Sequence, residues 1–346
     1  LVREVKNNQR QNSRIKYSPT LYSPAKQKTG YKTLEGDHVL PQNFNTIKEA
    51  KRWVDDRKDQ LHLVYGNTQF AYNYLADTYK GRVDWNLEQV LIITIDIEVQ
   101  CENGFPSAFF AEEELLSITI KNHQNKKIVV WGIGEFKTDR DDVTYIQCKN
   151  EKQLLKKFLV FWENHYPDVV TGWSSEFFDI PYLCNRITRL LGEKELKKLS
   201  PWGIVKEDNV KQGQYGQAAQ KYNLLGVSIL DYLDLYRKFT YVNRESYRLD
   251  YIAEVELGEK KDPNPYETFR EWYTKDYKSF VDYNVQDVEL VDKLEDRMKL
   301  IELCMTLAYE AKVNLVDVYS QVRVWDILIY NFLKERNIVI PRKRPS

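Results

Sequence analysis

Alternating apolar and polar positions predict several β-strands in the middle of the chain. The most apolar covers residues 91–99 (Leu-Ile-Ile-Thr-Ile-Asp-Ile-Glu-Val), which is rich in β-branched residues, lacks Gly and Pro, and has polar neighbours. Residues 116–120 and 127–132 alternate in a similar way across a polar turn, and residues 143–147 form a short fourth strand. Residues 168–173 predict a further, buried strand. The middle of the chain therefore favours a sheet.

Apolar residues at three- and four-residue steps predict helices between and after these strands. Residues 151–165 are the clearest case, and further helices are expected up to about residue 191, over a short segment opening at 246–253, and from about 283 to 311. Three strands, a helix, a strand and a helix follow one another as in a ribonuclease-H-like α/β domain, although several other folds share this order.

The first part of the chain has a different pattern. Residues 1–45 are polar, with little periodicity beyond a few short strands. Thr46 and Glu49 have the spacing of a capping box for a helix that reaches about Leu61. Residues 69–75 predict one more strand. Because nothing in this part resembles a catalytic site, we expect it to pack or to bind.

The 346 residues leave room for about two domains. We expect a smaller α+β N-terminal domain of residues 1–87, completed by residues 313–346, and a mixed α/β domain of residues 88–312. The helix predicted at 322–334 is apolar nearly all round, so it should pack on the N-terminal domain or on a partner.

Two segments before the long helix are less regular. Residues 196–226 are rich in Lys and Gln and predict an exposed hairpin or an extended loop, with glycines at Gly213, Gly216 and Gly226. Residues 227–238 are apolar and contain Asp231 and Asp234, which we interpret as acids that flank a site rather than as ligands.

Composition narrows the function classes. Lys and Arg (51) balance Asp and Glu (51), so the chain has no basic field for coating duplex DNA, and any nucleic acid must be held locally. The 24 tyrosines and 8 tryptophans could stack on bases or pack cores. The four cysteines and four histidines lie far apart, which indicates a reducing compartment and no zinc site. The sequence has no apolar run long enough to span a bilayer and no signal peptide. Because the first residue is Leu and not Met, we expect a chain trimmed from something longer.

The apolar strand at 91–99 carries two acids. Side chains alternate faces along a strand, so Asp96 and Glu98 leave the same face as Thr94. Paired carboxylates in apolar surroundings are costly unless a positive charge lies between them, and a divalent metal is the usual one. The alternative is a solvent-facing edge on which the acids are harmless.

Two further acidic sites follow. Asp179 stands where a helix N-cap belongs, with Pro181 in the first turn, so it is either a cap or a ligand. Tyr283 and Asp287 are four residues apart on the long helix and share one face, either as a surface pair or as part of a site.

The three sites together carry a resemblance. Asp96-Ile97-Glu98, Phe178-Asp179 after a Thr-Gly-Trp strand, and Tyr283-Asn284-x-x-Asp287 resemble, in order and separation, the three proofreading-exonuclease motifs of family B DNA polymerases. Blocks throughout the chain are similar to the T-even-type bacteriophage replicative polymerases, so the resemblance covers nearly all of it. These blocks lie at residues 31–44, 171–173, 227–236 and 249–253.

The resemblance implies a ribonuclease-H-like 3′–5′ exonuclease that removes mispaired 3′ nucleotides with two divalent ions, Mg²⁺ or Mn²⁺, about 4 Å apart. It implies that Asp96, Glu98 and Asp287 hold one ion and that Asp96 and Asp179 hold the other. Tyr283 would orient the attacking water, as in the tyrosine class of these enzymes; a sister class has a histidine there.

The resemblance also implies substrate contacts. Phe105 matches an aromatic that wedges against bases at a frayed end, with a loop-anchoring role as the alternative. Phe178 and Ser174 would contact the primer end, and Ser174 replaces the usual Asn with a shorter reach. Lys261, or its neighbour Lys260, corresponds to a basic residue near the site. The segment 204–225 matches the hairpin that separates the strands.

The implied partners are single-stranded DNA or a frayed primer 3′ end, the remaining polymerase domains in the same chain or as a separate subunit, and a sliding clamp through those domains. No polymerase palm motif is present, so the chain is expected not to synthesise DNA alone; it is a trimmed piece or the N-terminal part of a split polymerase. The implied location is the cytoplasm of an infected bacterial host.

Two other functions compete with a DNA exonuclease. One is a non-catalytic subunit that binds nucleic acid or the polymerase, although a scaffold has no reason to keep Asp96, Glu98, Asp179 and Asp287 together. The other is an exonuclease that acts mainly on RNA, since no residue distinguishes ribose from deoxyribose.

Overall fold

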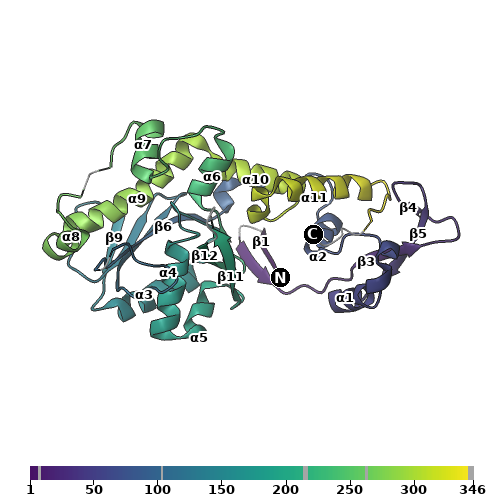
Figure 1. Ribbon diagram of the computed structural model, residues 1–346, viewed down its shortest axis with the longest axis horizontal. Helices are drawn as coiled ribbons and strands as arrows, with labels where there is room; N and C mark the ends of the chain where they lie inside the picture. Colours follow the sequence, from purple (N-terminus) through teal and green to yellow (C-terminus); the bar gives the residue numbers. More distant parts are fainter. Residues whose placement is uncertain (7–8, 103, 213–216, 262–263, 342–346) are drawn as a thin grey trace. The chain divides into compact units, whose positions relative to one another are not determined.

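The computed structural model of the protein describes residues 1–6, 9–102, 104–212, 217–261 and 264–341 (Figure 1). The chain divides into two compact units, which consist of Leu1–Val2, Ser13–Trp85 and Leu303–Ser346, and of Arg3–Asn12 and Asn86–Glu302. These units differ from the domains expected from the sequence in the placement of residues 3–12, 86–87 and 303–312.

The larger unit is built on a mixed six-stranded sheet with the strand order β13-β10-β6-β7-β8-β9. The neighbours of β7 run antiparallel to it, and the other pairs are parallel. Strands were predicted at five of these places, and those predictions are confirmed. The bounds are β6 Ile92–Val99, β7 Leu115–Asn122, β8 Ile128–Gly132, β9 Val143–Gln147, β10 Val169–Thr171 and β13 Ser228–Ile229.

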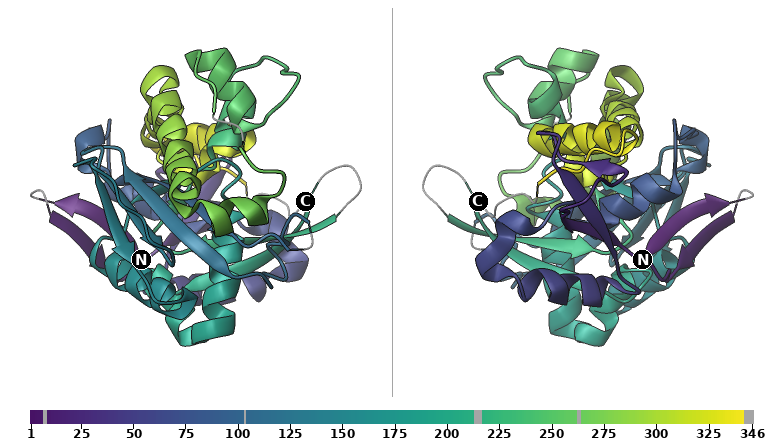
Figure 2. Two further views of the ribbon diagram at one scale, coloured as in Figure 1. Left: turned by 90° about the vertical axis from the view of Figure 1, so that its left-hand side faces the viewer. Right: turned by 90° about the vertical axis from the view of Figure 1, so that its right-hand side faces the viewer.

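Helices cover both faces of this sheet (Figures 1 and 2). On one face, Ile93, Ile95 and Ile97 of β6 join the main apolar core together with side chains of α3 (Glu151–Asn164) and α4 (Asp179–Leu191). On the other face lies α9 (Tyr277–Met298). The period-two alternation of β6 therefore directs its isoleucines to the core and Thr94, Asp96 and Glu98 toward α9. This mixed α/β architecture is the ribonuclease-H-like arrangement expected from the sequence.

The remaining helices of the larger unit are short. They are α5 Glu193–Leu196, α6 Tyr232–Phe239, α7 Leu249–Leu257 and α8 Phe269–Lys275, with single 3₁₀ turns at Leu87–Gln89 and Lys197–Leu199. An antiparallel hairpin of β11 (Val205–Gln212) and β12 (Gln217–Leu224) confirms the hairpin expected there. Its tip, with Gly213 and Gly216, lies outside the described residues.

The long helix expected to reach residue 311 is interrupted, so that prediction is wrong. Lys299 has a left-handed backbone (φ 57°), and α10 begins at Leu300 and runs to Ala311. The buried carboxylate of Glu295 accepts hydrogen bonds from the backbone N–H groups of Ile301 (3.0 Å) and Glu302 (3.2 Å). A side chain that accepts hydrogen bonds from the first backbone N–H groups of α10 stabilises the break between α9 and α10.

The smaller unit combines a three-stranded sheet with helices. The sheet has the order β3-β5-β4, and a two-stranded ribbon of β1 and β2 precedes it in the chain. The ribbon strands are β1 Val2–Lys6 and β2 Gln9–Ser13, and most of their residues belong to the larger unit. The elements of the smaller unit are β3 Thr20–Pro24, β4 Tyr31–Lys32, β5 His38–Asn43, α1 Ile47–Asp55, a 3₁₀ helix Lys58–Leu63, α2 Phe70–Thr78, a 3₁₀ helix Leu315–Tyr319 and α11 Gln321–Lys334.

Two sequence predictions in the smaller unit need correction. The helix capped by Thr46 ends at Asp55, and 3₁₀ structure continues to Leu63. Residues 69–75 are not a strand but part of α2, in which Phe70 and Asn73 are buried. The aromatic residues alternate there, but β-propensity is a weak guide where packing favours a helix. In the described part of the chain, no helix is long and apolar enough to cross a bilayer.

Candidate metal centre

Three carboxylates from two elements meet above the sheet. Asp96 and Glu98 lie on β6, and Asp287 lies on α9. One oxygen of each lies within 4.8 Å of the others, so a single ion could contact all three. Glu98 and Asp287 are largely buried, which excludes the solvent-facing edge considered for the strand acids.

A buried asparagine holds α9 against these strands. Asn284 donates through Nδ2 to Asp96 Oδ2, and its Oδ1 accepts hydrogen bonds from the hydroxyls of Ser117 (3.0 Å) and Thr119. Thr119 and Ser117 stand opposite Asp96 and Glu98 on β7. Sequence reasoning included Asn284 in a motif but missed this contact, because only the fold brings a polar residue of the helix to two strands.

Asp179 approaches the same strand from α4. The sequence left open whether it caps this helix; the structure makes it the first helical residue, after Phe178. Asp179 Oδ1 instead accepts a hydrogen bond from the backbone N–H of Ile97 at 3.0 Å. The side chain is buried, and this hydrogen bond places its carboxylate beside β6 at Ile97, the residue between Asp96 and Glu98.

Burial and mutual repulsion make these acids hard to ionise. Burial, followed by the charges of Asp179, Asp287 and Glu98, raises the pKa of Asp96 well above its usual value. Burial, together with the charge of Asp287, raises the pKa of Glu98 to about 8. Burial likewise raises the pKa of Asp179 to about 7, and the pKa of Asp287 is also raised.

Lys261 supplies a positive charge at this site. Its Nζ lies 2.5 Å from each carboxylate oxygen of Asp287 and 3.3 Å from the centre of the Tyr283 ring. One ammonium group does not balance four carboxylates. A cluster of oxygen donors with excess negative charge fits a hard divalent cation, so Asp96, Glu98, Asp179 and Asp287 suit Mg²⁺ or Mn²⁺.

Tyr283 lies one helical turn before Asp287, on the same face of α9. Its ring packs edge-on against Trp272, with the ring centroids 4.8 Å apart. Burial raises the pKa of the Tyr283 phenol to about 12, so the hydroxyl keeps its proton at neutral pH and can donate a hydrogen bond.

Phe105 and Phe178, both expected to contact substrate, lie side by side. Their ring centroids are 5.0 Å apart, and Phe178 also packs on Tyr182. The Phe105 side chain is 84% exposed, which disfavours the alternative of a loop anchor, since an anchor would be buried. The exposed ring leaves an aromatic surface next to α4.

Ser174 lies in a strained loop that leads into α4. Its backbone is left-handed (φ 65°), and its N–H donates to Asp231 at 3.1 Å. Asp231 also accepts hydrogen bonds from the backbone N–H groups of Glu176 (3.0 Å) and Leu233 (2.9 Å). Sequence reasoning treated Asp231 as a flanking acid; the signal it missed is an aspartate directly before a helix start.

Residues 54–252 match the sequence profile of the exonuclease domain of family B DNA polymerases. The chain belongs to this family. DNA-directed DNA polymerases of Escherichia phage RB69 and Enterobacteria phage T4 are each 32% identical to it, over 99% and 95% of the chain. A DNA polymerase catalytic subunit of alcelaphine herpesvirus 1 is 26% identical over 81%. The chain spans about two fifths of the two phage polymerases, 41% and 39% of their lengths.

The profile match to the family B exonuclease domain ends before the third acidic site. It includes Asp96, Glu98 and Asp179 but not Tyr283 or Asp287. The fold adds the third site independently, because α9 carries Asp287 to within 4.8 Å of the strand acids.

Proposed function

We propose that this family B exonuclease domain hydrolyses the 3′-terminal phosphodiester of single-stranded or frayed DNA, as the proofreading part of a replicative polymerase. The observation that supports this most strongly is the meeting of Asp96, Glu98 and Asp287 within 4.8 Å, from a strand and a helix. Asp179, bonded to the same strand, adds a fourth acid.

In this proposal, Asp96, Glu98 and Asp287 hold one divalent ion, and Asp96 with Asp179 holds a second. Bound ions neutralise the acids, activate water and stabilise the leaving oxygen. The protonated Tyr283 hydroxyl donates a hydrogen bond that orients the attacking water. Lys261 offsets part of the negative charge that would otherwise repel a phosphate.

The aromatic surface of Phe105 and Phe178 gives a place for the terminal bases. Stacking on aromatic rings tolerates any base, which suits an enzyme that must remove whichever nucleotide is mispaired. Ser174 can still hydrogen-bond the primer end, with a shorter reach than an asparagine. From the similarity to the phage polymerases, we also propose that this chain works with the remaining polymerase domains and, through them, with a sliding clamp. Its proposed location is the cytoplasm of an infected bacterial host.

The test uses a 5′-labelled single-stranded DNA oligomer with Mg²⁺ or Mn²⁺. We expect the wild-type protein to give a ladder that shortens from the 3′ end. The ladder should be absent in EDTA, in the Asp96→Ala/Glu98→Ala protein and in the Asp287→Ala protein. Asp282→Ala is the matched control, because it removes a partly exposed carboxylate from the same helix. An intact oligomer that still binds would contradict catalysis and favour a binding subunit. Faster cleavage of a matched RNA oligomer would favour an RNA exonuclease.

A further inference from the structure

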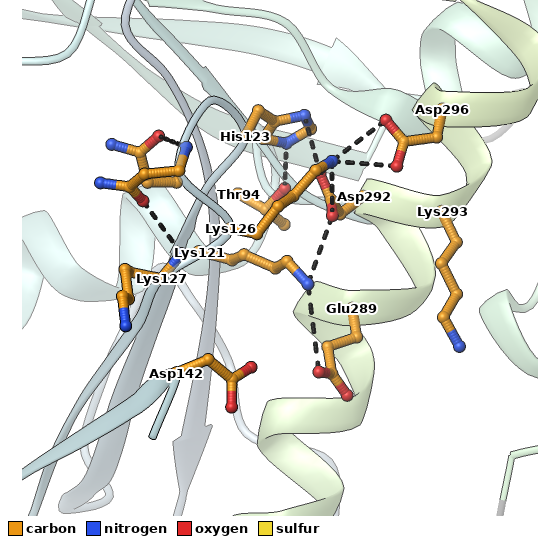
Figure 3. A network of polar contacts seen from close by, with 12 residues as sticks. Thr94, Lys121, His123, Lys126, Lys127, Asp142, Glu289, Asp292, Lys293 and Asp296 are labelled. Carbon is orange, nitrogen blue, oxygen red and sulfur yellow. Dashed lines mark hydrogen bonds and ion pairs between the residues drawn. The ribbon is translucent and has the colours of Figure 1, made fainter. Parts of the chain in front are cut away.

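A second polar network joins β6 to α9 (Figure 3). Thr94 lies two residues before Asp96 on the same face of β6, and Asp292 lies further along α9 than Asp287. His123, from the turn between β7 and β8, connects them. Its Nε2 lies 2.7 Å from Thr94 Oγ1, and its Nδ1 lies 3.2 Å from Asp292 Oδ1.

The chemistry of the partners assigns the direction of both contacts. An ionised carboxylate can only accept, so His123 Nδ1 carries a proton toward Asp292. Burial lowers the pKa of His123 to about 4, so at neutral pH its ring is uncharged and Nε2 accepts from the Thr94 hydroxyl. The backbone N–H of His123 also donates to Ile92 O at 3.0 Å, which ties the turn to β6.

Two lysines hold Asp292 and its neighbours from the sheet side (Figure 3). Lys126 Nζ lies 2.8 Å from Asp292 Oδ1 and 2.9 Å from Asp296 Oδ2. Lys121 Nζ lies 3.2 Å from Asp292 and 3.9 Å from Glu289. The acids of this part of α9 therefore share two lysines, whereas the four carboxylates of the candidate metal centre share Lys261.

A hydroxyl, a histidine and an aspartate in this order also form the catalytic triad of serine hydrolases, where the hydroxyl attacks the substrate. That role does not fit here, because Thr94 has 0% exposure and no substrate can reach its oxygen. The network must act on the protein itself.

The network attaches α9 to β6 at a second place along the helix. Asn284 contacts β6 through Asp96, and Asp292 contacts it through His123 and Thr94. These attachment points are about two helical turns apart, roughly 12 Å along the axis, and Asp287 lies between them. These two attachments to β6 oppose both rotation and sliding of the helix around Asp287, in addition to the ion pairs of Lys121 and Lys126 with Asp292.

We propose that Thr94, His123 and Asp292 are positioning residues that hold α9 in register with β6, and thereby keep Asp287 within metal-binding distance of Asp96 and Glu98. This inference depends on the proposed metal-dependent function. Outer residues of this kind orient the groups that contact the metal without touching it.

The test compares Thr94→Val, which removes the hydroxyl at constant shape, with Thr94→Ser, which keeps it. Mn²⁺ binding to the DNA-free protein is measured from the electron paramagnetic resonance signal of free Mn²⁺, and kcat and KM are measured on single-stranded DNA. For Thr94→Val we expect about tenfold weaker Mn²⁺ binding and a similar fall in kcat with KM unchanged. Thr94→Ser should match the wild-type protein. Thr144→Val, at an exposed position on β9, is the control for the substitution itself.

Melting temperatures establish that each variant is folded under the assay conditions. His123→Asn tests the same link from its other side, because the shorter amide can reach Asp292 but not Thr94, and it replaces Thr94→Val if that variant does not fold. Wild-type Mn²⁺ affinity and kcat in the folded variant would overturn the inference, and so would equal losses in Thr94→Val and Thr94→Ser. If the wild-type protein binds Mn²⁺ but does not cut DNA, the proposed function fails while the binding comparison still decides the positioning role.

Discussion

At the scale of single residues, Glu98 shows how a site can oppose the stability of its own fold. Its carboxyl binds a proton more tightly in the folded protein, with a pKa of about 8, than in the unfolded chain, where the value is near 4.5. The metal-free protein should therefore lose stability as the pH rises from about 4.5 to about 8. A bound divalent ion removes this cost because it favours the ionised form.

We predict that Glu98→Gln stabilises the protein in EDTA at pH 8 by roughly 1–3 kcal/mol, since the amide has the same shape and no charge to bury. The measurement is urea unfolding at pH 5 and pH 8, with and without Mg²⁺. The stability of the variant should depend less on pH and on Mg²⁺ than that of the wild-type protein. Glu245→Gln, at an exposed position, is the control. A variant less stable than wild type in EDTA at pH 8 would contradict this account.

At the scale of elements, the loop between β10 and α4 depends on one buried aspartate. Asp231 caps α6 and also accepts the N–H groups of Ser174 and Glu176, so one carboxylate fixes the start of one helix and the approach to another. Asp179 follows three residues after Glu176. The position of a candidate metal ligand therefore depends on an acid that does not belong to the cluster.

We predict that Asp231→Ala lowers the free energy of unfolding by about 2–4 kcal/mol, because one buried and two partly buried N–H groups lose their acceptor. Cleavage by the folded fraction should fall as well, because the loop before Asp179 loses its anchor. Asp231→Asn keeps one acceptor oxygen and should lose less of both. Urea unfolding and single-turnover cleavage give the two quantities. Full cleavage by folded Asp231→Ala would show that the loop holds its position without this residue.

The elements also show what the sequence could predict. The strands around Asp96 and the helix α3 were predictable because their periods of 2 and 3.6 reflect which face is buried. The break at Lys299 was not, because it depends on a carboxylate, Glu295, that reaches its partners only in the folded chain. The acids of the site were found as motifs, whereas the contacts of Asn284 and His123 were missed because they join segments far apart in the sequence.

At the scale of the whole molecule, α11 presents an apolar face to solvent. Ile327, Tyr330 and Leu333 are buried, which confirms for one face the packing expected from the sequence. The opposite face exposes a stripe at helical spacing, with more than half of each side chain accessible. The stripe consists of Val322 (66% exposed), Trp325 (64%), Ile329 (51%) and Phe332 (55%).

We predict that this chain self-associates as its concentration rises, because contiguous exposed apolar side chains favour association. Trp325→Lys/Phe332→Lys should reduce association, measured by sedimentation velocity, and leave the melting temperature unchanged, since neither side chain is buried. Val160→Lys, which removes one exposed apolar side chain from α3, should have no effect. Equal association of the double variant and the wild-type protein would show that the stripe does not drive it.

The bond between Asn284 and Asp96 joins residues 188 positions apart in the sequence. Contacts of such long range form late, because the intervening chain must lose its freedom before they contribute. When the ribosome has completed the sheet, the candidate metal centre is therefore still incomplete: it closes only when α9 has emerged and docked. The recovery of Mn²⁺ binding during refolding should therefore follow the last step of folding rather than the first.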